Sequence, residues 1–124
     1  MSYQTFEDLE VWKKARVLKN EIKELTTSFP PDEKYRLTDQ LIRSSRSINS
    51  QIAEGHGRRT TKERIQFCII ARGSLSETLN HLIDAFDCNY IGIEILNEFK
   101  SKIIEIERML NGYISYLTNK LKSE

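Results

Sequence analysis

Seven basic side chains are concentrated between positions 36 and 64 of this 124-residue chain. Only Asp39, Glu54 and Glu63 oppose them, so this stretch has a net charge of +4 in a chain whose net charge is +1. Clusters of lysine and arginine bind the phosphates of nucleic acids. Our candidate nucleic-acid-binding residues are therefore Arg36, Arg43, Arg46, Arg58, Arg59, Lys62 and Arg64.

The spacing of these residues also allows a simpler interpretation. Arg43 follows Asp39 by four residues, the helical spacing at which an acid and a base pair on the surface. A run of charges is most often a solvated helix face rather than a binding site. The sequence therefore leaves open whether the stretch binds phosphates or is an ordinary polar surface.

Arg72 interrupts an otherwise apolar helical pattern between positions 65 and 86. A guanidinium group does not lose its proton, so a buried arginine needs an acidic partner. Glu54 and Glu77 are the candidate partners. We predict that Arg72 forms a structural ion pair with one of them, and we give it no catalytic role.

No arrangement of residues in the chain predicts an enzyme. His56 could act as a general base, but no Ser/His/Asp or Cys/His pattern and no phosphate-binding loop accompanies it, and we predict that it lies in a loop. Glu77, His81 and Asp84 share a helix face and could bind a cation, although surface pairing is the more common role of such residues. We therefore predict a non-enzymatic protein with no metal and no cofactor.

Aromatic side chains offer another possible contact with nucleic acid, because bases stack on them. At helical spacing, however, aromatics usually belong to a core or to an interface. Trp12 lies beside a complete apolar seam, which indicates more apolar surface than one chain needs and favours self-association. The aromatics considered are Trp12, Tyr35, Tyr90, Tyr113 and Tyr116.

Apolar residues repeat at spacings of three and four, which predicts helices over about 6–27, 32–54, 61–87 and 93–120. Capping signals begin at Thr5 and Thr60, and we expect Gly55 and Gly57 to end the second helix in left-handed geometry. With short connections, these helices predict a single all-α domain over 1–124. The expected architecture is an antiparallel, up-down-up-down, left-handed four-helix bundle.

Composition supports a globular, cytoplasmic protein: 30% of residues are charged and 39% are hydrophobic. The start of the chain lacks the pattern of a signal peptide, and the longest apolar run, 67–71, is too short to span a membrane. We therefore expect no membrane partner. Cys68 and Cys88 lack metal-binding spacing, so we expect both to be reduced, as in a cytoplasmic protein.

Several segments, in order, resemble the 23S rRNA intervening-sequence protein family, a four-helix bundle family also called the S23 family. They are 9–15 (LEVWKKA), 29–30 (FP), 37–43 (LTDQLIR), 47–48 (SI), 52–55 (IAEG) and 71–75 (ARGSL). Asn49 occupies the position at which the family commonly has proline. The resemblance extends from about residue 6 to residue 117.

This resemblance implies a homo-oligomer, in particular a pentameric ring. A relative of the family, the accessory variability determinant of diversity-generating retroelements, binds nucleic acid and a reverse transcriptase through a basic surface. We therefore expect an oligomeric bundle that binds RNA, DNA or a ribonucleoprotein partner such as a reverse transcriptase. The alternative is a protein–protein adaptor or assembly scaffold without nucleic-acid contact.

Overall fold

The computed structural model describes residues 5–124 and is entirely helical in its regular elements, with no strand in that range. Its four α-helices are α1 (Glu10–Thr26), α2 (Leu37–His56), α3 (Thr61–Asp87) and α4 (Ile93–Lys122). Two short 3-10 helices, η1 (Phe6–Asp8) and η2 (Pro31–Glu33), precede α1 and α2. The structure thus confirms the predicted all-α four-helix bundle.

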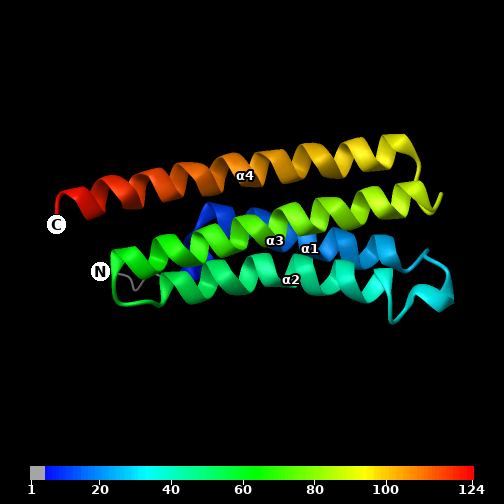
Figure 1. Ribbon diagram of the computed structural model, residues 1–124, viewed down its shortest axis with the longest axis horizontal. Helices are drawn as coiled ribbons and strands as arrows, with labels where there is room; N and C mark the ends of the chain where they lie inside the picture. Colours follow the sequence, from blue (N-terminus) through cyan, green and yellow to red (C-terminus); the bar gives the residue numbers. More distant parts are fainter. Residues whose placement is uncertain (1–4) are drawn as a thin grey trace.

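Each helix runs antiparallel to the next, and every helix packs against its two neighbours, with α4 returning beside α1 (Figure 1). The buried residues follow the predicted spacings of three and four, which place them on one face of each helix. Burial of these side chains is the main stabilising contribution. The largest fully buried aliphatic side chains are Leu18, Ile22, Leu41, Ile48, Ile52, Leu75, Leu82, Ile106, Leu110 and Leu117.

Small polar residues lie between α2 and α3. The Thr78 hydroxyl donates to Ser44 Oγ at 2.9 Å and is completely buried. One helical turn away, the hydroxyls of Ser47 and Ser74 lie 3.0 Å apart. These hydrogen bonds satisfy polar groups that would otherwise be destabilising in a core.

The capping signal at Thr5 was assigned to the wrong helix. Thr5 and Asp8 do form a reciprocal capping box, but it closes the single turn of η1. Leu9 then adopts extended backbone angles, and α1 begins at Glu10. The short η1 turn packs its Phe6 ring edge-on against Trp12, at a centroid distance of 5.0 Å. Trp12 is therefore half-buried within its own chain.

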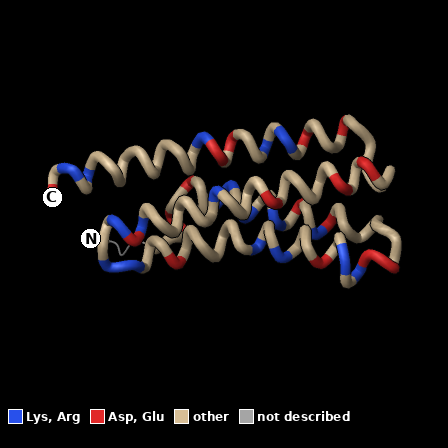
Figure 2. Tube along the Cα trace, in the orientation of Figure 1, with Lys and Arg blue, Asp and Glu red and all other residues tan. Residues whose placement is uncertain are grey.

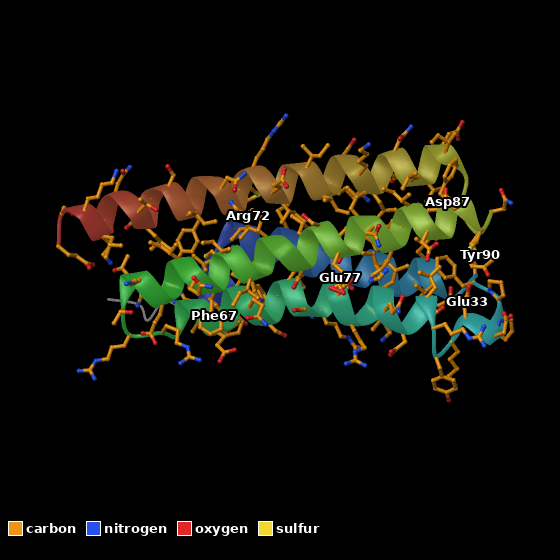
Figure 3. The ribbon with its side chains drawn as sticks, in the orientation of Figure 1. Glu33, Phe67, Arg72, Glu77, Asp87 and Tyr90 are labelled. Atoms are coloured by element: carbon orange, nitrogen blue, oxygen red, sulfur yellow. The ribbon has the colours of Figure 1, made fainter. Side chains whose placement is uncertain are left out.

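The second helix begins five residues later than predicted, at Leu37. The proline pair starts the short η2 turn, and the backbone angles of Arg36 lie outside the helical region. Glu33 fastens this turn to the α3–α4 connection, because its carboxylate accepts a 2.7 Å hydrogen bond from the hydroxyl of Tyr90. Figure 3 shows Glu33 and Tyr90 together at this end of the bundle.

The prediction that Gly55 and Gly57 form a left-handed cap is wrong. Gly55 lies inside α2, His56 is the last residue of that helix rather than a loop residue, and Gly57 has right-handed backbone angles. Glycine is needed at position 55 for space: an added Cβ would lie 2.8 Å from Phe67 Cβ. Among the described residues, only Asn89, in the α3–α4 connection, has a positive φ, of 64°.

The capping box predicted at Thr60 and Glu63 is confirmed at the start of α3. The end of α4 extends further than predicted, to Lys122. Beyond it, the Glu124 carboxylate accepts a 2.6 Å hydrogen bond from the Thr61 hydroxyl, which joins the end of α4 to the start of α3. None of the described helices has an apolar segment long enough to cross a membrane.

Candidate nucleic-acid interface

Three of the predicted basic residues follow α2 along its outer face. Arg36 precedes the first residue of the helix, and Arg43 and Arg46 lie within it, all three with exposed side chains. At 1.5 Å of rise per residue, Arg36 is roughly 33 Å from Arg58 at the other end of the helix. The seven predicted residues therefore form an extended row rather than one compact cluster.

Two acids neutralise part of this row. Arg43 lies 3.6 Å from Asp39 and Arg58 lies 2.9 Å from Glu54, both at the i,i+4 spacing. The predicted Asp39–Arg43 pairing is thus confirmed. Exposed pairs of this kind contribute only about 0–1 kcal/mol, so Arg43 can exchange its partner for a ligand at little energetic cost.

Two arginines at the α2–α3 corner make stabilising contacts within the protein. The guanidinium of Arg58 lies over the Phe67 ring, 4.7 Å from its centroid, in addition to its ion pair with Glu54. Arg64 Nε donates a 3.0 Å hydrogen bond to the backbone carbonyl of Arg58. These half-buried side chains shape the corner more than they present charge to a ligand.

The first turn of α3 is capped by its own side chains. Thr60 Oγ1 accepts a hydrogen bond from the backbone N–H of Glu63, and the Glu63 carboxylate accepts from the hydroxyl and backbone N–H of Thr60. These hydrogen bonds from Thr60 hold the pKa of Glu63 below its usual value. The reciprocal cap occupies two of the backbone donors that an anion would otherwise reach.

The exposed cations at this corner are Arg59 and Lys62. Neither has an acidic oxygen within 4.0 Å among residues 5–124, and the same is true of Arg46 on α2. Their charges are therefore available to an external anion.

Sequence reasoning missed two further cations, Lys120 and Lys122. Both are exposed at the end of α4, which the contact between Thr61 and Glu124 brings to the start of α3. The predicted antiparallel topology could have identified them, because the last turn of a fourth helix must lie near the first turn of the third.

The two ends of the bundle differ in charge. Residues 20–41 and 80–103 form the end that contains the α1–α2 and α3–α4 connections, and they carry 5 basic and 9 acidic side chains, or −4. The remaining residues carry 14 basic and 9 acidic side chains, or +5. Figure 2 shows basic residues at the α2–α3 turn and acidic residues around the opposite connections. Arg36 belongs to the acidic end.

The predicted ion pair of Arg72 with Glu54 or Glu77 is wrong. Arg72 lies on the α4 side of α3 and donates a 2.9 Å hydrogen bond to the Asn111 side chain, whereas Glu77 faces the α2 side (Figure 3). Glu54 pairs with Arg58, and Glu77 lies 3.6 Å from His81. Arg72 is only half-buried, so water compensates its charge and no acid is required.

Asn49 was not predicted to have a role, but it links two helices. It is buried on α2 and donates a 3.1 Å hydrogen bond to the backbone carbonyl of Trp12 on α1. A carbonyl of α1 thereby gains a donor from a neighbouring helix. Asn49 thus helps to fix the position of α1 beside α2.

The sequence matches the family model described as 23S rRNA-intervening sequence protein over residues 7–112. The matched range includes three helices and most of α4. The chain belongs to this family. All seven predicted basic residues lie within the matched part of this family member.

A solved structure supports the fold of this family member. It is a protein of unknown function from the S23 ribosomal protein family of Bacteroides thetaiotaomicron, 24% identical in sequence, with a TM-score of 0.78. The similarity covers 85% of this chain and 95% of the other. At this identity the likeness establishes the shared fold. No curated protein matches the chain.

Proposed function

We propose that this family member is a non-enzymatic, oligomeric bundle that binds the phosphate backbone of RNA or DNA. The observation that supports this most directly is the group of exposed cations Arg46, Arg59 and Lys62, none of which has an acid within 4.0 Å in the described chain. Lys120 and Lys122 extend the same group from α4.

The residues of the proposed interface have different roles. Arg59 and Lys62 contact phosphate at the corner, and Arg43 and Arg46 extend the contact along α2. Arg58 and Arg64 hold the corner in shape through Phe67 and the loop backbone. Arg36 contributes least, because the acidic end of the bundle repels phosphate.

Self-association is part of the proposal, with a pentameric ring as the expected form. The outer face of α3 supports self-association. Between Glu63 and Asp84, the exposed residues that share this face are all uncharged. Ile69 and Ile83 are exposed on this face, and Ile104 is exposed on the adjoining helix α4. A ring would repeat the cations around one assembly, which multiplies a weak affinity for a long nucleic acid. The uncharged face consists of Gln66, Ile69, Gly73, Ser76, Asn80 and Ile83.

Salt dependence tests the proposed phosphate contacts. Fluorescence anisotropy with labelled RNA and DNA should show an affinity that falls steeply between low and physiological salt, because each phosphate contact releases counterions. Reversing Arg59→Glu together with Lys62→Glu should weaken binding by about tenfold or more. If the affinity changes neither with salt concentration nor in this double variant, the proposal of nucleic-acid binding is rejected.

The matched control reverses two charges at the other end of the bundle. Lys34→Glu with Arg36→Glu changes the net charge by the same amount but lies in the acidic end. It should leave the affinity nearly unchanged. An equal loss in both double variants would show a general effect of net charge rather than a site at the corner.

A protein–protein adaptor or scaffold is the second candidate, favoured by the exposed isoleucines on α3 and α4. Its partner could be a ribonucleoprotein component such as a reverse transcriptase. Light scattering with Ile69→Lys and Ile83→Lys distinguishes the roles of this face. Dissociation to monomers would assign it to self-association, whereas an unchanged oligomer would leave it available to a different protein.

A further inference from the structure

Tyr113 and Tyr116 form an aromatic pair at the cation-rich end of the bundle. Their rings are nearly parallel, with an angle of 10° between them and a centroid distance of 6.3 Å. Tyr113 is half-buried, but Tyr116 is 62% exposed, and its hydroxyl has no hydrogen-bond partner among the described residues. The inner ring thus supports an outer ring that faces solvent.

The difference in length between α1 and α4 leaves this pair uncovered. Helix α4 has 30 residues and α1 only 17. The start of α1 lies level with Tyr113, because Leu9, Glu10, Val11, Met109 and Tyr113 line one surface hollow. Tyr116 lies almost one turn further along α4, beyond the start of α1.

Cations border the tyrosine pair on two helices. Lys120 follows Tyr116 by four residues and therefore lies on the same face of α4. Arg64 of α3 lies near the inner ring: burial raises the pKa of Tyr113, and the positive charge of Arg64 acts in the opposite direction. Lys120 therefore places positive charge beside the outer ring.

The pair lies at the same end of the bundle as the proposed phosphate-binding corner. Lys120 and Lys122 lead along α4 to Glu124, which is hydrogen-bonded to Thr61 at the start of α3. Lys62 is the next residue of that helix. A nucleic-acid strand that crosses this end of the bundle can therefore place phosphates on the lysines and a base beside Tyr116.

We propose that Tyr116 stacks on an unpaired base of a single-stranded nucleic acid whose backbone contacts Lys120, Lys62 and Arg59. The inference rests on the proposed function, since it names the form of nucleic acid bound at the same end of the molecule. Proteins that bind single strands combine a positive surface with exposed aromatic rings, and each stacked base contributes about 1–3 kcal/mol. In a duplex the faces of the bases are occupied by their neighbours, so Tyr116 discriminates against it.

The protein itself has little need of an aromatic ring at position 116. Leu117 is 1% exposed and anchors this turn of α4, whereas Tyr116 is 62% exposed. Removal of the ring should therefore leave folding intact. This separates an effect on binding from an effect on stability.

The test compares single-stranded oligouridine with duplex RNA of equal length by fluorescence anisotropy at one salt concentration. The wild-type protein should bind the single strand more tightly. Tyr116→Ala should weaken single-strand binding by about 5- to 150-fold, which corresponds to one lost stacking contact. Tyr116→Phe retains a stacking ring and should bind like the wild type.

Tyr35→Ala is the matched control, because Tyr35 is 83% exposed and its ring lies beside Lys34, but at the acidic end of the bundle. It should leave both affinities unchanged. Equal affinity for duplex and single strand, or an unaltered affinity of Tyr116→Ala, overturns the inference and leaves the phosphate contacts in place.

Two other outcomes of this experiment would lead to different conclusions. Absence of binding to both the single-stranded and the duplex RNA overturns this inference together with the proposed contact with RNA. Dissociation of the Tyr116→Ala oligomer in light scattering would also overturn the inference, because Tyr116 would then be an interface residue.

Discussion

Gly55 of α2 lies directly against Phe67 of α3, so closely that a methyl group at position 55 would come within 2.8 Å of Phe67 Cβ. That atom is attached to the α3 backbone, so it can move away only if the helix shifts. Alanine at position 55 would gain about 1 kcal/mol in helix propensity, but overpacking a core costs about 1–3 kcal/mol. We expect Gly55→Ala to lower the free energy of unfolding by about 1 kcal/mol in chemical denaturation.

Gly112→Ala is the control for that experiment. Gly112 is also inside a helix, but no atom lies within 4 Å of its added Cβ. This variant should raise the free energy of unfolding by about 0.5–1 kcal/mol, since only the propensity term changes. A stabilised Gly55→Ala variant would show that α2 and α3 can separate without cost.

Tyr90 should ionise well above the ordinary pKa of a tyrosine. Its hydrogen bond to Glu33 and its partial burial raise its pKa to about 12, from an ordinary value of 10. A raised pKa means that the folded state favours the protonated form, so the contribution to stability is complete below pH 10. It is lost as the pH rises towards 12. Ultraviolet absorbance of tyrosinate should show a titration near pH 12, which disappears in Tyr90→Phe.

Tyr35→Phe provides the comparison for this titration, because Tyr35 is exposed and makes no hydrogen bond through its hydroxyl among the described residues. It should leave the titration near pH 12 in place. Glu33→Gln removes the negative charge but keeps an acceptor, so it should move this titration to lower pH. A titration near pH 12 that persists in Tyr90→Phe would belong to another residue.

Arg72 should couple energetically to Asn111 and not to Glu77. In a double-mutant cycle with alanine substitutions, the Arg72–Asn111 pair should give a coupling of about 0.5–1 kcal/mol, the range for a hydrogen bond to an exposed charged group. The Arg72–Glu77 cycle should give a coupling near zero. The reverse result would restore the ion pair that the sequence predicted.

The two cysteines should differ in reactivity. Burial raises the pKa of the Cys68 thiol to about 11, whereas Cys88 is exposed at the end of α3. Because the thiolate is the reactive form, one thiol in each folded chain should react with Ellman's reagent at mildly alkaline pH. Cys88→Ser should abolish this fast reaction, and denaturant should restore one reactive thiol. Fast labelling of folded Cys88→Ser would show that the core around Cys68 opens readily.

The sequence was sufficient to predict the fold because a helix reveals its buried face through local periodicity. The repeats at three and four identified residues such as Leu41, Ile48 and Leu82 as core. The capping box of Thr60 and Glu63 predicted the start of α3 because both partners lie within one turn. The pairing of Asp39 with Arg43 followed from the same local geometry. Interactions within one or two turns require no knowledge of the other helices.

Only the tertiary structure decided which residues meet between helices. Arg72 contacts Asn111, and Phe67 occupies the space that a side chain at position 55 would need. Each contact depends on the rotation of one helix about its axis and on its axial position beside the next. The packing of all four helices together sets both quantities, because a shift of one residue along a helix turns its side chains by about 100°. The apolar spacings of three and four therefore determined which face of each helix is buried. The packing of the helices determined which residues of the other helices that face contacts.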